Sequence, residues 1–314
     1  MERAWELNGK PDSGIDVLCV GHASHDLIFL VDHHPEADGK CFARAMQSCG
    51  GGPAANAAVA VARLGGRSAL AAYLGEDLYG CLHHEELVEE GVNTDCITRG
   101  PHPTPLSVIL VKPNGDRSVI NHKSGTPPLS SLPCDLGAVS PGVILFDGHE
   151  PRISPVLARE ARARGIPSIL DAGSVHPGSV DLLSLVDCLV ASERFSREYT
   201  GEVDPERALV KLRERVAFTA VTLGGKGVVW SDKADTARLA AFPVDAVDTT
   251  GAGDTFHGAF ALCLARGMDS HSSLLYSSAA AALCCTRVGA RTGIPTRREL
   301  EAFLHARSSA HKDR

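Results

Sequence analysis

An acidic residue follows a glycine-rich turn at the start of an apolar segment, in the stretch DTTGAGDTFHGAFALCLARG from Asp248 to Gly267. Its apolar residues recur at helical spacing, which predicts a turn followed by a buried helix. Amides at a helix start lack partners within the helix and can bind an anion, and a carboxylate beside them, that of Asp254, can serve as a general base. The alternative is a structural role for Asp254 as a helix-start acid. Taken alone, the stretch favours the structural role, because acids are common at helix starts.

Two further stretches place polar residues beside predicted turns. Three glycines, residues 50–52, precede a predicted helix that begins at Pro53, and such glycines let backbone approach a ligand closely. A mobile turn without a ligand is the alternative. Asn56 in that helix faces either a ligand or solvent. Asp26 follows the first predicted strand in GHASHD, where a ligand contact and a turn-forming role both remain open.

Several other sites of chemistry are disfavoured. In TLGGKG, Lys226 is followed by Gly227 where a phosphate-binding loop needs Ser or Thr, and no G-x-G-x-x-G opens a helix, which argues against a dinucleotide-binding oxidoreductase. The histidine pairs at 33–34 and 83–84 are adjacent rather than four residues apart, so we expect solvent-exposed side chains instead of metal ligands. His257 is expected to be packed or hydrogen-bonded.

Composition limits the class of protein further. The chain has 314 residues, 44% of them hydrophobic, and a net charge of −7, so we expect no nucleic-acid partner. There is no apolar signal core at the start and no apolar run long enough to span a bilayer, which predicts a cytoplasmic protein with no membrane partner. The ten cysteines form no C-x-x-C motif, a pattern that fits reduced thiols rather than a disulfide scaffold.

The elements that must position these residues alternate along the chain. Continuous apolar runs such as IDVLCVG, VILFDG and PSILDAG alternate with helical stretches, which predicts an α/β fold with a mostly parallel sheet covered on both faces. Two stretches break the alternation and are expected to form a small antiparallel β-sheet lid, residues 28–49 and 104–123. The predicted core comprises residues 14–27, 50–103 and 124–306, with tails at 1–13 and 307–314.

The ordered set of motifs resembles the ribokinase-like (PfkB) carbohydrate kinases. GGGPAANAAVAVARLGG and DTTGAGDTFHGAFALCLARG are similar to the two signature regions of that family, and GEDLYG, TPLSVILVKPNGDRSVI, VTLGGKGVV and CCTRVGARTGIP follow the same order. The resemblance implies a ribokinase-like three-layer α/β/α core and ATP-dependent phosphorylation of a sugar or nucleoside hydroxyl with Mg²⁺. It makes Asp254 the base and gives the anion hole to Gly251, Ala252 and Gly253.

The resemblance also implies the remaining site residues and the assembly. Sugar contacts fall on Ser24, Asp26, Gly51, Gly52 and Asn56. Nucleotide contacts fall on Ser192, Thr222, Gly224, Gly227 and Ser277. A loop region that binds a monovalent cation such as K⁺, mainly through backbone carbonyls, falls on Asp248, Thr250, Cys284, Arg287, Gly289 and Gly293. The lid of the family often forms the contact of a homodimer.

Departures from the family pattern bear on substrate and metal. Many members carry a lysine at the sugar where this chain has Pro53, which makes ribose a poor candidate. The N-x-x-E magnesium motif is replaced, with Ser192 and Phe195 at the Asn and Glu positions and only Glu193 nearby.

Within the family, the chain looks most like the sulfofructose kinase or ketohexokinase-like branch. Lys40 and Asn121 match residues that hold an anionic C6 group there. His149 stands where that branch has an arginine, whose planar guanidinium can donate two parallel hydrogen bonds to such a group. The expected acceptor is therefore the C1 hydroxyl of a ketohexose, or of a C6-anionic ketose such as sulfofructose or fructose 6-phosphate. A nucleoside kinase is the alternative, although Phe29 and Phe42 are the only lid aromatics; a non-catalytic sugar-binding regulator is a less favoured one.

Overall fold

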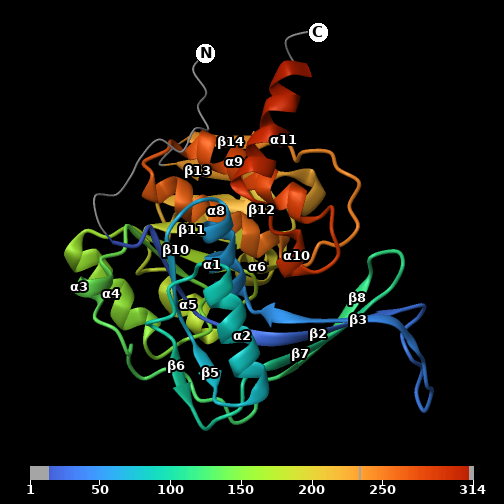
Figure 1. Ribbon diagram of the computed structural model, residues 1–314. Coiled ribbons are helices and arrows are strands. Elements are labelled where there is room, and N and C mark those ends of the chain that lie inside the picture. Colours follow the sequence, from blue (N-terminus) through green and yellow to red (C-terminus); the bar gives the residue numbers. More distant parts are fainter. Residues whose placement is uncertain (1–13, 233–234, 311–314) are drawn as a thin grey trace.

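A computed structural model describes residues 14–232 and 235–310 (Figure 1). Its main sheet has eight strands in the order β14-β13-β12-β11-β10-β9-β1-β4. Neighbouring strands pair in parallel from β12 to β4, while β13 and β14 are antiparallel. The strands of this main sheet are β1 (Val17–Val20), β4 (Ser68–Ala71), β9 (Val143–Phe146), β10 (Ser168–Ala172), β11 (Cys188–Ser192), β12 (Phe218–Thr222), β13 (Val228–Asp232) and β14 (Asp235–Leu239).

Helices cover both faces of the main sheet, as the continuous apolar runs predicted (Figure 1). One face packs against α1, α8, α9 and α11, and the other against α4, α5, α6 and α7. The helices are α1 (Pro53–Arg63), α2 (Leu78–Glu89), α3 (Leu136–Val139), α4 (Ser154–Arg164), α5 (Pro177–Leu182), α6 (Glu193–Thr200), α7 (Pro205–Arg213), η1 (Gly224–Lys226), α8 (Ala252–Ala265), α9 (Ser270–Cys284), α10 (Ala290–Gly293) and α11 (Arg297–Ala310). The predicted C-terminal tail is shorter than expected, because α11 runs through residues 307–310; residues 1–13 and 311–314 lie outside the described residues.

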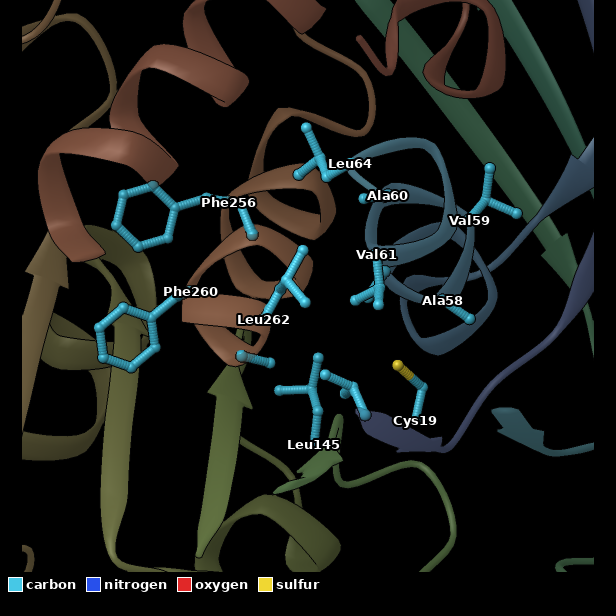
Figure 2. Packing of buried hydrophobic residues seen from close by; sticks show 14 of the residues in the cluster. Cys19, Ala58, Val59, Ala60, Val61, Leu64, Leu145, Phe256, Phe260 and Leu262 are labelled. Carbon is cyan, nitrogen blue, oxygen red and sulfur yellow. The ribbon is translucent and has the colours of Figure 1, made fainter. Parts of the chain in front are cut away.

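The near-continuous apolarity of α8 follows from its position between the sheet, α1 and α9. Phe260 and Leu262 of α8 meet Val61 of α1 and Leu145 of β9 in one cluster (Figure 2). Full burial of each large apolar side chain contributes about 1.5–3 kcal/mol to stability. Gly258, which interrupts the apolar run, lies at the crossing with α1: a Cβ there would come within 2.5 Å of a backbone oxygen of α1.

A second, smaller sheet projects from the main body and corresponds to the predicted lid (Figure 1). We call it the small sheet; it comprises β2 (Ser24–Val31), β3 (Ala43–Gly51), β7 (Leu106–Val111) and β8 (Arg117–His122), in the order β3-β2-β7-β8. It is mixed and not antiparallel throughout, because β2 and β7 both run outward from the core and pair in parallel. A two-stranded parallel pair, β5 (Tyr73–Gly75) and β6 (Thr98–Gly100), completes the strands.

No helix within residues 14–232 and 235–310 is long and apolar enough to cross a membrane. One expectation about side chains is wrong: His83 of α2 is fully buried, whereas an exposed residue was predicted. Two adjacent histidines in the sequence do not indicate that one of them, His83, packs beneath Gly50 of the small sheet.

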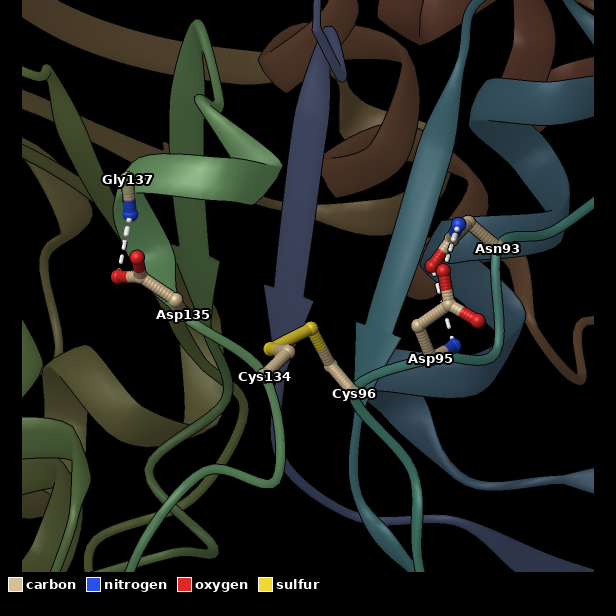
Figure 3. Close-up of a disulfide and its surroundings, with 6 residues drawn as sticks. All are labelled: Asn93, Asp95, Cys96, Cys134, Asp135 and Gly137. Carbon is tan, nitrogen blue, oxygen red and sulfur yellow. Dashed lines mark hydrogen bonds between the residues drawn. A yellow bond between two sulfur atoms is a disulfide. The ribbon is translucent and has the colours of Figure 1, made fainter.

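The expectation of reduced thiols is wrong for one pair of cysteines. A disulfide joins Cys96, just before β6, to Cys134, just before α3, and eight cysteines remain free (Figure 3). Hydrogen bonds order the chain on both sides: the Asp95 amide donates to Asn93, and Asp135 accepts from the Gly137 amide at the start of α3. The bond therefore ties the segment that follows the small sheet to the core.

Removing this disulfide is expected to lower the free energy of unfolding by up to about 4 kcal/mol, since it closes a loop with a sequence separation of 38 residues. The measurement is urea unfolding of wild type and of the Cys96→Ala/Cys134→Ala variant, each with and without reductant. Wild type alone should lose stability when reduced. An identical midpoint for oxidised and reduced wild type would contradict the bond.

Candidate active site

The turn before α8 has the backbone geometry of an anion site. Gly251 has φ +76, and a Cβ there would lie 2.6 Å from the Cβ of Ala290, so only glycine fits. Gly251 caps α8 without any side-chain hydrogen bond. Within the described part of the chain, no acceptor pairs with the amides of Gly253 and Asp254, and the space beside Gly253 is open. These two amides, in the first turn of α8, can therefore receive an oxyanion. The amide of Ala252, which was predicted to do so, instead donates to the carbonyl oxygen of Thr249 over 3.3 Å.

Asp254 lies on α8 and meets Asn56 of α1. Asn56 Nδ2 donates to Asp254 Oδ2 over 2.7 Å, across a sequence separation of 198 residues. Asn56 Oδ1 is buried and has no hydrogen-bond partner among the described residues. The pKa of Asp254 is raised to about 7, first by loss of hydration and then by the nearby charge of Asp171. A carboxylate that titrates near neutrality beside an unpaired acceptor suits a hydroxyl-bearing ligand.

A buried histidine fastens this turn to the sheet. His257 Nδ1 lies 2.6 Å from the carbonyl oxygen of Gly253 and 3.2 Å from Oδ2 of Asp171, at the end of β10. His257 Nε2 lies 3.2 Å from the carbonyl oxygen of Val190 in β11. Burial lowers the pKa of His257 and raises that of Asp171. The expectation that His257 is packed and hydrogen-bonded is confirmed; Asp171 was not identified from sequence, although it ends a predicted strand.

The predicted sugar residues of β2 and β3 come together on one side of the small sheet. Asp26 accepts a hydrogen bond from Ser24 Oγ over 3.0 Å and another from the Ser107 side chain. Gly51 pairs with Ser24, and a Cβ on Gly51 would lie 2.1 Å from Asp26 Oδ2. Gly52 has φ +94 and packs against the backbone of residue 22. The two glycines are thus explained by close backbone approach, and Asp26, whose pKa is raised by burial, remains the polar group that can bind hydroxyls.

A single carboxylate, missed by sequence reasoning, joins two loops and the start of α1 around this region. Asp147 follows β9 and accepts from the amides of His22 (2.7 Å), Ala54 (3.2 Å) and His149 (2.8 Å). Gly21 is required here, because a Cβ on it would lie 1.9 Å from Asp147 Oδ1. Since β1 and β9 are neighbours in the sheet, their carboxyl ends bring these loops to one place.

His149 stands in a row of three histidines. Its ring lies 5.4 Å from that of His22 and stacks 4.7 Å from that of His176, measured between centroids. Burial, and secondarily the Lys123 charge, lowers the pKa of His22 to about 3, and burial also lowers that of His176. Those two rings are therefore neutral at physiological pH, and Lys123 supplies the nearby positive charge.

The other two residues predicted to hold a C6 group lie on the small sheet and its turn. Asn121 of β8 is opposite Ser107 of β7, and cross-strand partners share a face, so Asn121 lies on the same side of the small sheet as Asp26. Lys40 is exposed in the turn between β2 and β3. No described contact joins Lys40 to His149.

The predicted nucleotide residues fall into two groups. Thr222 ends β12 and is partly exposed, and Gly224, with φ +57, has open space around it, so both can contact a ligand. Gly227 has φ +94, and a Cβ there would lie 2.0 Å from the carbonyl oxygen at the end of β14, which explains this glycine without a ligand. Ser277 is fully buried and donates to the carbonyl oxygen of Ser273, which argues against a nucleotide contact.

The residues at the magnesium-motif positions do not form a carboxylate site. Ser192 caps α6 by accepting from the amide of Phe195, and Phe195 is fully buried in the core. Glu193 is paired with Lys226 over 3.3 Å. Among the residues that the structure describes, no cluster of three His, Cys, Asp or Glu could hold a metal ion. The residues at these positions therefore do not fit a protein-bound magnesium ion.

The predicted cation residues form two loops joined by one carboxylate. Asp248 accepts from the amide and hydroxyl of Thr250 and, through its other oxygen, from the amide of Gly289. Arg117 of β8 donates to the Thr250 hydroxyl over 2.7 Å, so the small sheet contacts the same loop. The thiol of Cys284 faces the carbonyl oxygen of Thr250 at 3.7 Å.

The second loop continues from Cys284 through α10. Gly293 packs on the backbone of Cys284, where a Cβ would lie 2.5 Å from its carbonyl oxygen. The carbonyl oxygen of Ala290 lies 4.0 Å from the same thiol, so two carbonyl groups converge there. The Arg287 side chain instead points outward and pairs with Glu299.

Comparisons with known proteins agree with this geometry. A family model described as pfkB family carbohydrate kinase matches residues 15–297. The ribokinase of Bacillus subtilis (strain 168) is 30% identical over 295 residues, which cover 92% of this chain and 99% of that protein. The fructokinase of Vibrio alginolyticus is 27% identical over 301 residues, covering 88% and 96%. A crystal structure of a candidate ribokinase from Agrobacterium tumefaciens matches with a TM-score of 0.88 at 34% identity, covering 94% and 99%.

These similarities correct the branch expected from sequence. The relatives are described as ribokinases and a fructokinase, not as sulfofructose kinases or ketohexokinases. The predicted ribokinase-like α/β fold is confirmed. Because the family model spans most of the chain, and a relative at 30% identity is matched almost end to end, this chain belongs to the pfkB family of ATP-dependent carbohydrate kinases, which transfer a phosphoryl group to an alcohol.

Proposed function

We propose that this kinase phosphorylates the primary C1 hydroxyl of a ketohexose, with or without an anionic group at C6. The observation that carries the proposal is Asp254, held by Asn56 beside the open amides at the start of α8. Asp254 has a pKa of about 7, which suits it to accept a proton near neutral pH.

In the proposed reaction the acceptor oxygen attacks the γ-phosphorus of ATP. The bond between that phosphorus and the β–γ bridging oxygen breaks, ADP leaves, and the hydroxyl proton passes to Asp254. The amides of Gly253 and Asp254 donate to the charge that spreads over the transferred group. Positioning and charge stabilisation therefore account for most of the catalysis.

Features of the sugar side favour a ketohexose over ribose. Pro53 stands where the family resemblance implies a lysine, so a cation that contacts ribose is absent from that position. Ser24 and Asp26 supply a paired hydroxyl and carboxylate for the hydroxyls of a furanose ring. His149, between two neutral histidines and near Lys123, supports a site for the distal end of a six-carbon sugar, including an anionic C6 group.

The experiment is ADP release from ATP with fructose, fructose 6-phosphate, sulfofructose, ribose and adenosine, with the product phosphate located by NMR. We expect kcat/KM to be highest for one of the three ketoses, with the phosphate on C1. Preference for ribose would overturn the assignment of the acceptor, and preference for adenosine would point to the nucleoside kinase. No turnover of any acceptor would favour a non-catalytic regulator.

We also propose that K⁺ binds between the two loops joined by Asp248, where the carbonyl oxygens of Thr250 and Ala290 converge on Cys284. Oxygen ligands of this kind suit hard cations. Activity should therefore be higher in KCl than in the same concentration of tetramethylammonium chloride. Equal rates in the two salts would count against a cation site.

A homodimer through the small sheet is the proposed assembly. All six residues of β8 are exposed, and the exposed apolar side chains of the small sheet and of its β2–β3 turn include Phe42, Met46 and Ile120. Light scattering should give twice the chain mass, and Ile120→Asp should shift it toward the monomer. A monomeric wild type would refute this assembly.

A further inference from the structure

A buried arginine outside the proposed catalytic groups lies behind the glycine run of β3. Arg291 of α10 has a side chain only 4% exposed, and its Nε lies 3.4 Å from Oε1 of Glu86 in α2. Its Nη2 lies 3.3 Å from Nε2 of His83. Burial, and secondarily the charge of Arg291, holds the pKa of His83 well below its usual range, so this ring is a neutral acceptor. Glu86 is thus the carboxylate that balances the arginine.

The same glutamate holds the glycine run. Glu86 Oε2 accepts from the amide of Gly50 over 2.5 Å. A Cβ on Gly50 would lie 2.3 Å from the ring of His83 and 2.9 Å from Nη2 of Arg291, so this backbone rests directly on the cluster. Gly50 precedes Gly51, which packs on Asp26.

On its other side, α10 contacts the turn that leads into α8 and its open amides. The residue before Arg291, Ala290, packs against Gly251 so closely that no Cβ fits between them. The carbonyl oxygen of Arg291 accepts from Nη1 of Arg63, which is paired with Glu90 at the C-terminal cap of α2. Contacts on both sides of α10 therefore place it between the phosphoryl side and the sugar side of the site.

We infer that Arg291 is a positioning residue that acts through Glu86 to fix the glycine run beside the proposed sugar residues Ser24 and Asp26, and so links sugar binding to the loop after α9. The inference rests on the proposed function, because it concerns the affinity for the acceptor. Arg291 itself lies behind the glycines, on the side away from Asp26, since His25 alternates with Ser24 and Asp26 along β2 and lines the same cavity as Arg291.

A cavity beside Arg291 allows a positioning role of this residue to be distinguished from a purely structural one. It has a volume of about 550 Å³ and is open to solvent, and its lining includes Arg291, Glu86 and His25. Nη1 of Arg291 has no hydrogen-bond partner among the described residues, although the side chain is buried. A small guanidinium compound can therefore reach the place that the Arg291 side chain leaves when it is truncated.

The test compares Arg291→Met and Glu86→Gln with the control Arg164→Met, which breaks an exposed pair on α4. Loss of the ion pair between Arg291 and Glu86 should raise KM for the acceptor by about tenfold or more, while KM for ATP and kcat stay within about twofold. The effects of Arg291→Met and Glu86→Gln should not add in the double variant, because the two residues act through one contact. Methylguanidinium should lower the raised KM of Arg291→Ala, and methylammonium should not.

Hydrogen exchange gives a readout that does not depend on the acceptor. Arg291→Met should increase deuterium uptake in residues 50–56 of the substrate-free protein relative to Arg164→Met. An unchanged uptake there, an unchanged acceptor KM, or equal losses for ATP and acceptor would each overturn the inference. Inactivity of wild type on every acceptor would refute the proposed function alone, because the exchange experiment would still decide the role of Arg291.

Discussion

Asp254→Asn is expected to lower kcat by about 10²- to 10⁴-fold, which is the usual contribution of a positioned base. The amide keeps the shape of the side chain and its contact with Asn56, but it cannot accept the hydroxyl proton. The pKa of Asp254 is raised to about 7, so wild-type kcat/KM should fall as the pH drops through that value and the base becomes protonated. The variant should lack this acid limb.

The stability of the Asp254→Asn variant should not fall with its activity. A carboxyl with a raised pKa in the folded state binds its proton more tightly there than in the unfolded chain, so its ionisation above neutral pH costs folding free energy. The Tm of Asp254→Asn at pH 8 should therefore equal or exceed that of wild type. Asp95→Asn, on an exposed loop, is the control for activity. Near-normal turnover by Asp254→Asn would remove Asp254 from the base role.

Asp147→Asn is expected to raise KM for the acceptor by about hundredfold while KM for ATP changes little. In wild type, three backbone N–H groups donate to the two oxygens of Asp147. The side-chain NH2 group of the asparagine would face at least one of these donors and leave it without an acceptor, and each unsatisfied buried donor costs about 1–3 kcal/mol. The segments that carry His22, Ala54 and His149 should then lose their fixed spacing.

Steady-state kinetics and thermal unfolding test this expectation together. A control is Asp187→Ala, which removes the acceptor of two hydrogen bonds from Ser168 at the start of β10, away from the proposed sugar residues. That control should lower Tm without changing KM for the acceptor. If Asp147→Asn likewise lowered Tm without changing KM for the acceptor, then Asp147 would be a stabilising residue only.

Much of the fold follows from local patterns in the sequence. Continuous apolar runs predicted the parallel sheet, and Gly251 with the apolar stretch after it predicted the turn and α8. The small sheet was predicted as antiparallel because a pairing of β2 with β7, more than 70 residues apart, leaves no trace in local alternation. The contact of Asp254 with Asn56 could not be predicted from local patterns, because the two residues are separated by 198 positions in the sequence.

The residues missed from sequence owe their roles to distant partners. Asp147 looks like any acid after a strand, since its three amides come from residues 22, 54 and 149. Asp171 and Arg291 likewise acquire their partners only through folding. Phe195 shows the reverse case, in which a position matched to a family motif is occupied by a core side chain.

The close packing of α1 against α8 restricts a residue that contacts no ligand, Gly258. Asn56 and Asp254 stand on these two helices, and the hydrogen atom that Gly258 has in place of a side chain sets the interaxial separation between them. Even one methyl group at position 258 would wedge the helices apart and stretch the Asn56–Asp254 contact a single helical turn away. The position of the Asp254 carboxylate thus depends on the glycine at position 258. Natural variation at Gly258 should therefore be as restricted as at Asp254.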